Sequence, residues 1–224
     1  MDGFIPQTSL FIGIIPALII LYVGLKGYEG YYKDKLIYLT FIVGIIIGVA
    51  SAAIELLTQA IGFYYIFLFP ILEQLFKTIV LNLGRFHEKQ ETTVYGFSLG
   101  LGFGSVFTPV AIYFGNFHDI FSMIAAMIGS FGLTLFHAAT GILIGYGVYS
   151  NKLAKYLTLS IVLHFVITIV IGVTNLLSIG YLQITLVLYG LLVFWYALKR
   201  VMPRILAESQ RRKRTKKEIE IKSK

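Results

Sequence analysis

The segment that decides the fold runs from Leu36 to Ala60 and reads LIYLTFIVGIIIGVASAAIELLTQA, with Glu55 as its only charged residue. At a rise of about 1.5 Å per residue, a helix of this length crosses the roughly 30 Å hydrocarbon core of a bilayer. We therefore expect an all-α fold, a polytopic transmembrane bundle of about seven helices. The remaining expected helices lie at residues 8–25, 63–84, 92–115, 120–149, 156–178 and 182–201.

The composition excludes an ordinary soluble domain. Of the 224 residues, 57% are hydrophobic and only 13% are charged, with a mean hydropathy of +0.81. A soluble domain carries roughly 25% charged residues, which cover its surface. Cysteine is absent, which excludes disulfides and thiolate metal sites. We expect one bundle over residues 1–202 and a basic cytoplasmic tail over residues 203–224.

Lysine and arginine are distributed unevenly among the expected connections. The first, third and fifth expected helices are each followed by a connection that contains these residues, and the tail has a basic run from Arg211 to Lys217. The intervening connections contain none. Because cytoplasmic connections of membrane proteins are rich in lysine and arginine, we expect the N-terminus outside and the C-terminus inside. The expected location is the cell (plasma) membrane, where the tail contacts anionic lipid headgroups rather than nucleic acid.

A few ionisable side chains lie inside the expected helices, where charge is costly and requires a reason. At about 1.5 Å per residue, Glu73 lies roughly 16 Å from the predicted cytoplasmic end of its helix, His137 roughly 18 Å and His164 roughly 12–14 Å. These three residues are therefore expected to share one layer. Lys77 follows Glu73 by four residues on the same helix face, a spacing that allows an ion pair. Glu55 is expected nearer the outside.

One carboxylate and two imidazoles in a low-dielectric layer have a chemical interpretation. The carboxylate, with or without a histidine, can remove a proton from water, and a second histidine can stabilise the oxyanion that develops. Alternatively, Glu73, His137 and His164 can hold a divalent metal such as zinc, which acidifies its bound water. In both cases we expect the target to be a peptide bond of a transmembrane or membrane-adjacent segment.

Four motifs in the same order resemble those of the PrsW family of intramembrane proteases, within the wider CAAX-protease superfamily. The stretch 69–77, FPILEQLFK, resembles the family pattern of proline, two apolar residues and Glu-Glu-x-x-Lys. The stretch 94–104, VYGFSLGLGFG, resembles its glycine-rich helix, and 137–147, HAATGILIGYG, resembles its histidine element followed by Gly-Tyr-Gly. The stretch 163–168, LHFVIT, resembles its last histidine motif. The resemblance covers roughly residues 10–175.

This resemblance implies a role for each ionisable residue of the layer. It implies that Glu73 is the general base, that His137 is its partner on the attacking water, and that His164 contributes to the oxyanion site. Lys77 would be the structural cation of the first motif. The supporting positions would be Gln74, next to the base, and Thr168, four residues after the last histidine.

The sequence departs from the family pattern at three places. Gln74 replaces the second glutamate, Phe107 and Thr108 replace a Glu-Asn pair, and Thr168 replaces an asparagine. A glutamine can donate or accept hydrogen bonds but cannot act as a base. These departures keep open a catalytically inactive relative that binds a membrane segment or partner without cutting it.

A small proton-coupled transporter is a third possibility, with Glu73 and the histidines as a proton relay. Glu55 would then extend a polar path outward. A cytoplasm-facing cavity that ends at Glu73 would favour proteolysis, whereas a path that continues to Glu55 would favour transport. Taken singly, each histidine is also explained as a hydrogen-bonding contact between helices. Outside the layer, Glu55 with Gln59 is interpreted as a packing pair or pore-side group, and His87 and His118 as solvated loop residues.

Overall fold

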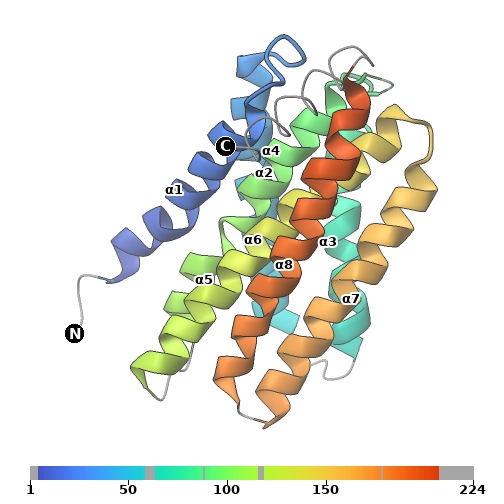
Figure 1. The fold of residues 1–224 in the computed structure, drawn as a ribbon. Coiled ribbons are helices and arrows are strands. Elements are labelled where there is room, and N and C mark those ends of the chain that lie inside the picture. Colours follow the sequence, from blue (N-terminus) through green and yellow to red (C-terminus); the bar gives the residue numbers. More distant parts are fainter. Residues whose placement is uncertain (1–4, 59–63, 88, 116–118, 178, 207–224) are drawn as a thin grey trace, which may run out of the picture.

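The computed structural model describes residues 5–58, 64–87, 89–115, 119–177 and 179–206, and these ranges contain helices and no β-strand. The all-α prediction is confirmed. The longer helices, in chain order, are α1 (Ile5–Leu25), α2 (Asp34–Thr58), α3 (Tyr65–Leu81), α4 (Thr92–Gly104), α5 (Phe107–Phe114), α6 (Ile120–Tyr149), α7 (Leu153–Leu177) and α8 (Ile184–Tyr196). Figure 1 shows them as a bundle in which α1 is inclined away at one side.

Several helices are long and apolar enough to cross a membrane, which fits an integral membrane protein. In the described ranges α3, with 17 residues, and the apolar part of α1, Phe11–Leu25, are shorter than these candidates. At about 1.5 Å per residue, α3 measures about 26 Å, slightly less than the hydrocarbon core. The 5 candidate spans are Asp34–Thr58, Thr92–Phe114, Ile120–Tyr149, Leu153–Thr174 and Gly180–Ile205.

The last of these candidate spans is composite. A 3-10 turn, η2 (Gly180–Gln183), precedes α8. A π-helical turn, η3 (Ala197–Val201), follows it and leads into a second 3-10 turn, η4 (Met202–Ile205). The expected helix at 182–201 is therefore one continuous helical path whose hydrogen-bond pattern changes at both ends.

The expected helix at 92–115 is divided into two helices. The α-helical path is interrupted at Ser105 and Val106, between α4 and α5. Pro109 has no backbone N–H, so the Ser105 carbonyl lacks the donor that a regular helix would supply four residues later. The Ser105 hydroxyl donates back to the Gly102 carbonyl at 2.8 Å. The break leaves α5 as a separate helix of 8 residues.

Helices α4 and α6 form the centre of the bundle, and α4 is buried along its whole length. A Cβ atom on Gly96 would fall on the Gly141 carbonyl oxygen, and one on Gly100 would fall on the His137 carbonyl oxygen. The two backbones therefore touch directly, as small residues permit in membrane helices. The contact also fixes the depth of His137 in the bundle.

The basic connections lie together at one end of the bundle. The turns at 26–33, 82–87 and 150–152 and the segment 197–206 are at the top in Figure 1, and we call this the basic end. Helices α2 and α5 end, and α3 and α6 begin, at the opposite, non-basic end. The side of the membrane that the basic end faces stays a prediction.

Candidate functional site

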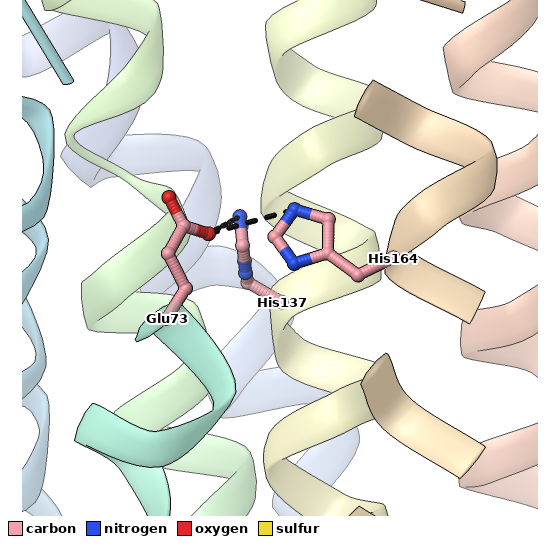
Figure 2. A group of neighbouring side chains, drawn as sticks. All are labelled: Glu73, His137 and His164. Carbon is pink, nitrogen blue, oxygen red and sulfur yellow. Dashed lines mark ion pairs between the residues drawn. The ribbon is translucent and has the colours of Figure 1, made fainter. Parts of the chain in front are cut away.

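The three side chains predicted to share a layer meet inside the bundle. Glu73 comes from α3, His137 from α6 and His164 from α7, and Figure 2 shows the carboxylate directed at both rings. Glu73 Oε2 lies 3.6 Å from His137 Nε2 and 3.5 Å from His164 Nε2. Their exposed fractions are 2%, 0% and 3%, so all three side chains are buried. The predicted convergence of these residues is confirmed.

Ser51 of α2 holds the Glu73 carboxylate from the other side. Its hydroxyl donates to Glu73 Oε1 at 3.0 Å, and Ser51 itself is fully buried. With Oε1 engaged, Oε2 is the oxygen that faces the histidines. Ser51 is not among the site residues predicted from the sequence. In the sequence, only a serine hydroxyl in an apolar helix, one turn before Glu55, marks this residue. Such serines are too common in membrane helices to identify a site residue by themselves.

Lys77 contacts His137 rather than Glu73. Its Nζ lies 3.0 Å from His137 Nδ1 and donates to Thr140 Oγ1 at 2.7 Å, and it is 5.0 Å from the centre of the Phe103 ring. Among the described residues, no ion pair within 4.0 Å joins Lys77 and Glu73. The spacing of four residues places both on one helix face, but the Lys77 side chain extends to α6 while Glu73 is held by Ser51.

His164 has a polar partner on its second ring nitrogen as well. Gln74 Nε2 lies 2.9 Å from His164 Nδ1, and Gln74 is fully buried. The glutamine that departs from the family pattern therefore orients one of the two histidines. The Tyr189 hydroxyl donates to the Leu163 carbonyl at 2.8 Å, which joins α8 to the helix that carries His164.

The other two departures lie at the edge of the cluster. The Phe107 ring stacks on His137, with 5.0 Å between ring centres and 13° between planes. The Thr108 hydroxyl accepts from Ser130 at 2.9 Å and does not reach the histidines. Thr168 donates to backbone carbonyls, at 3.1 Å to Phe165 among others. It lines the same cavity as Glu73, His137 and His164.

Three buried polar atoms around this cluster have no hydrogen-bond partner within the described part of the chain. They are Glu73 Oε2, His137 Nε2 and Gln74 Oε1. A buried polar atom without a partner costs roughly 1–3 kcal/mol, so several together indicate a place where a further molecule binds. The first two face the same point, between the carboxylate and the rings.

A cavity of about 260 Å³ begins at the cluster. On α3, α6 and α7, its lining residues nearest the basic end are Glu73, His137 and His164. From there it extends toward the non-basic end, past Ile167 and Leu133, as far as the residues that end α5 and begin α8. The cluster is thus the closed end of the cavity.

Glu55 lines the same cavity, one helical turn beyond Ser51 on α2. The cavity therefore extends away from the predicted cytoplasmic side and reaches the outer glutamate, which is the arrangement expected of a transport path. Gln59 and His118 lie outside the described residues. His87 is exposed in the turn after α3, as expected for a solvated loop residue.

The cluster can hold a metal ion. Glu73, His137 and His164 each offer one ligand atom, and these atoms all lie within 4.8 Å of one another. Metal-bound histidines usually donate their second N–H to a carboxylate or carbonyl. His137 Nδ1 instead faces the Lys77 amine, which donates hydrogen bonds whenever it is protonated. The distances fit a metal, but the surroundings of His137 do not favour one.

No model of a known protein family matches the chain, and neither the curated proteins nor the solved structures compared with it contain a match.

Proposed function

We propose that this chain is a membrane-embedded peptidase of the PrsW-like kind that its motifs resemble, hydrolysing a peptide bond within or beside the bilayer. The observation that supports this proposal most directly is that Glu73 Oε2 has no hydrogen-bond partner among the described residues. It lies 3.6 and 3.5 Å from the two histidine Nε2 atoms, at the closed end of a cavity. Glu73 is the general base, His137 its partner on the water, and His164 the donor at the oxyanion. The proposed location is the plasma membrane, with the tail 203–224 cytoplasmic.

The proposed reaction needs only these groups and water. The water oxygen attacks the carbonyl carbon as Glu73 removes a water proton, and the carbonyl π electrons move to its oxygen. His164 Nε2–H donates to that oxyanion. When the C–N bond breaks, the proton held by Glu73 passes to the leaving nitrogen. Ser51 keeps the carboxylate in the orientation that the proton transfers require.

A zinc ion held by the same three residues is the other arrangement of this site. Two ligands at 2.0–2.1 Å from a tetrahedral zinc would be about 3.4 Å apart, close to the separations of 3.5 and 3.6 Å. Zinc would supply an acidified water. The Lys77 contact to His137 Nδ1 opposes it, because a ring that accepts there carries its hydrogen on Nε2 and cannot ligate through it. We therefore propose the metal-free form.

The departures from the PrsW-like pattern at Gln74, Phe107 and Thr168 support an alternative, a catalytically inactive relative. Gln74 supplies no second carboxylate, and the Phe107 ring covers one face of His137. Such a protein would bind a membrane segment in the cavity without cutting it. This form predicts peptide binding that does not lead to products.

A proton-coupled carrier is the second candidate, and the cavity that joins Glu73 to Glu55 favours it. Lys77 and Thr140 extend the polar contacts from His137 toward the basic end. Against it, the cavity itself stops at the cluster in the described structure. A carrier would need a second conformation in which the opposite side opens.

The test is digestion of a library of membrane peptides by the purified protein in lipid. The parent chain is compared with Glu73→Ala, His137→Ala and a matched control, Glu29→Ala, which removes an exposed glutamate from the turn after α1. We expect cleavage by the parent and the control and none by the two site variants. A chelator should leave that cleavage unchanged. Loss of cleavage with the chelator, restored by added zinc, would show instead that the zinc-bound form is the active one.

Absence of cleavage by the folded parent would contradict the proposal. Proton flux into vesicles then separates the remaining candidates, since only a carrier shows flux that Glu73→Ala abolishes. Peptide binding without flux or products identifies the inactive relative.

A further inference from the structure

Helix α5 turns one apolar face to the cavity. Along this helix, the cavity is lined by Phe107, Val110, Ala111 and Phe114. Their spacing corresponds to one side of an α-helix, and each of these side chains is apolar. Phe107 begins α5 and lies beside the cluster, whereas Phe114 is the last residue of the helix. Helix α5 is therefore one wall of the cavity, and its first residue stands at the closed end.

The Phe107 ring lies directly beside the catalytic cluster of the proposed function. Its centre is 5.0 Å from the centre of the His137 ring, and the two planes are 13° apart, so the rings are stacked. The edge of the imidazole carries Nε2, which faces Glu73 Oε2 at 3.6 Å. A peptide group that hydrogen-bonds to this nitrogen lies about 3 Å from it. The side chain next to that peptide group is therefore within reach of the Phe107 ring.

Phe107 has little freedom to move aside. Its exposed fraction is 9%, one face is covered by His137, and the ring centre of the fully buried Phe103 lies 5.8 Å from its own. The Phe103 ring in turn lies 4.7 Å from the His137 ring. Closely packed interiors lose stability when larger groups are forced into them, because side chains then leave their preferred rotamers. A large side chain beside the scissile bond would have to displace these packed rings.

The wall next to the cluster is aliphatic on α6 and α7 as well. Leu133 precedes His137 by one helical turn on α6, and Ile167 follows His164 by three residues on α7, and both line the cavity. The cavity as a whole measures about 260 Å³, near the lower limit of ligand pockets, roughly 300 Å³. Such a space suits an apolar peptide segment whose residue at the cluster is small.

We infer that the cavity selects peptides with a small apolar residue, such as alanine, beside the scissile bond, and that Phe107 is the residue that excludes larger side chains. The inference rests on the proposed function, because it specifies the substrate of the same site. With one face covered by His137, the Phe107 ring limits the space rather than attracting an aromatic side chain by stacking. Phe107 thus determines which peptide binds and takes no part in the proton transfers.

The experiment measures peptide binding separately from cleavage. Two fluorescent, N-acetylated peptides of leucine and isoleucine differ only in one central residue, alanine or phenylalanine. They are titrated onto Glu73→Gln protein in lipid nanodiscs, alone and with Phe107→Ala, Phe107→Leu or Phe114→Ala added. Phe114→Ala is the matched control, because it removes the same ring from the far end of the same helix face.

We expect the alanine peptide to bind about tenfold more tightly than the phenylalanine peptide. Phe107→Ala should abolish or reverse this ratio, Phe107→Leu should reduce it, and Phe114→Ala should preserve it. Phe107→Leu keeps an apolar side chain in the packing, so it provides the test if Phe107→Ala does not fold.

Four results would overturn the inference. The Glu73→Gln protein could bind both peptides equally, bind the phenylalanine peptide more tightly, or bind neither. The ratio could also stay unchanged in the folded Phe107 variants, or fall in Phe114→Ala as far as it does in Phe107→Ala.

The two proposals fail in different ways. A preference for alanine that depends on Phe107, with no products from the parent chain, keeps the selective site and removes the peptidase. Cleavage that depends on Glu73 but is indifferent to the size of the neighbouring residue keeps the peptidase and removes the selection by Phe107.

Discussion

At the scale of single residues, the two oxygens of the Glu73 carboxylate have different surroundings. Ser51 donates to Oε1 at 3.0 Å, whereas Oε2 has no hydrogen-bond donor in the described part of the chain and faces both histidines. One oxygen fixes the direction of the carboxylate and the other stays available for a proton. This division requires a donor on α2, which makes Ser51 a positioning residue.

Ser51→Ala should lower kcat about tenfold and leave KM almost unchanged, because a hydrogen bond to a charged group that orients the base is lost. Steady-state kinetics on a cleaved peptide measure both constants. The matched control is Ser160→Ala, a fully buried serine that bonds the Tyr156 carbonyl within α7. Equal losses in the two variants would show that Ser51 is merely structural.

Lys77 should determine where the His137 ring carries its hydrogen. A protonated lysine can only donate, so the Nδ1 atom 3.0 Å away accepts and the hydrogen is on Nε2. We expect ¹⁵N NMR of histidine-labelled protein to show the Nε2–H form of His137, and Lys77→Met to introduce the other form. The His164 signal serves as internal control, since its Nδ1 contacts Gln74. A parent His137 with hydrogen on Nδ1 would contradict this assignment.

At the scale of elements, the contact between α4 and α6 sets the depth of His137 in the bundle. Gly100 lies against the backbone of His137 so closely that a Cβ atom would overlap its carbonyl oxygen. Any side chain at this position must push α4 and α6 apart. The distance between His137 and Glu73 depends on that contact, because Glu73 is held independently by α2 and α3.

Gly100→Ala should lower the free energy of unfolding by about 1–3 kcal/mol, as overpacking does in other well-packed interiors. Reversible denaturation in mixed micelles measures the change. Gly84→Ala is the control, because a Cβ atom there would meet nothing within 4 Å. Equal free energies of unfolding of Gly100→Ala and the parent would contradict this prediction, because α4 and α6 could then move apart without loss of stability.

Much of the fold follows from sequence periodicity and hydropathy, and the site follows in part. Because the rise per residue of a helix is constant, the distance of each residue from the end of its helix predicted that Glu73, His137 and His164 share one layer. The same calculation could not predict the contact of Ser51 with Glu73, since nothing in the sequence fixes the rotation of α2 about its axis. The spacing of Lys77 from Glu73 defined a helix face but not the direction of a long side chain, which in the structure extends to α6.

At the scale of the whole molecule, the basic end and the cavity lie on opposite sides of the cluster. Under the predicted orientation, the cavity extends toward the outside and the tail toward the cytoplasm. A substrate would then enter from the outer half of the bilayer. The prediction depends entirely on the orientation, which the distribution of lysine and arginine implies.

The absence of cysteine makes this orientation directly measurable. Tyr181→Cys places a thiol at an exposed position of the non-basic end, and Glu29→Cys places one in the turn at the basic end. A membrane-impermeant maleimide added to intact cells should label the Tyr181 variant and spare the Glu29 variant until the cells are lysed. The reverse labelling would mean that the cavity extends toward the cytoplasm.

The central claim is that Glu73 activates a water for attack on a peptide bond. A peptide cleaved by the parent chain is digested in ¹⁸O-labelled water by the parent and by Glu73→Gln, and the products are weighed by mass spectrometry. The account predicts one ¹⁸O atom in the new carboxyl group with the parent and no product with Glu73→Gln. Cleavage by Glu73→Gln at the parent rate, or products without ¹⁸O after a single turnover, would contradict it.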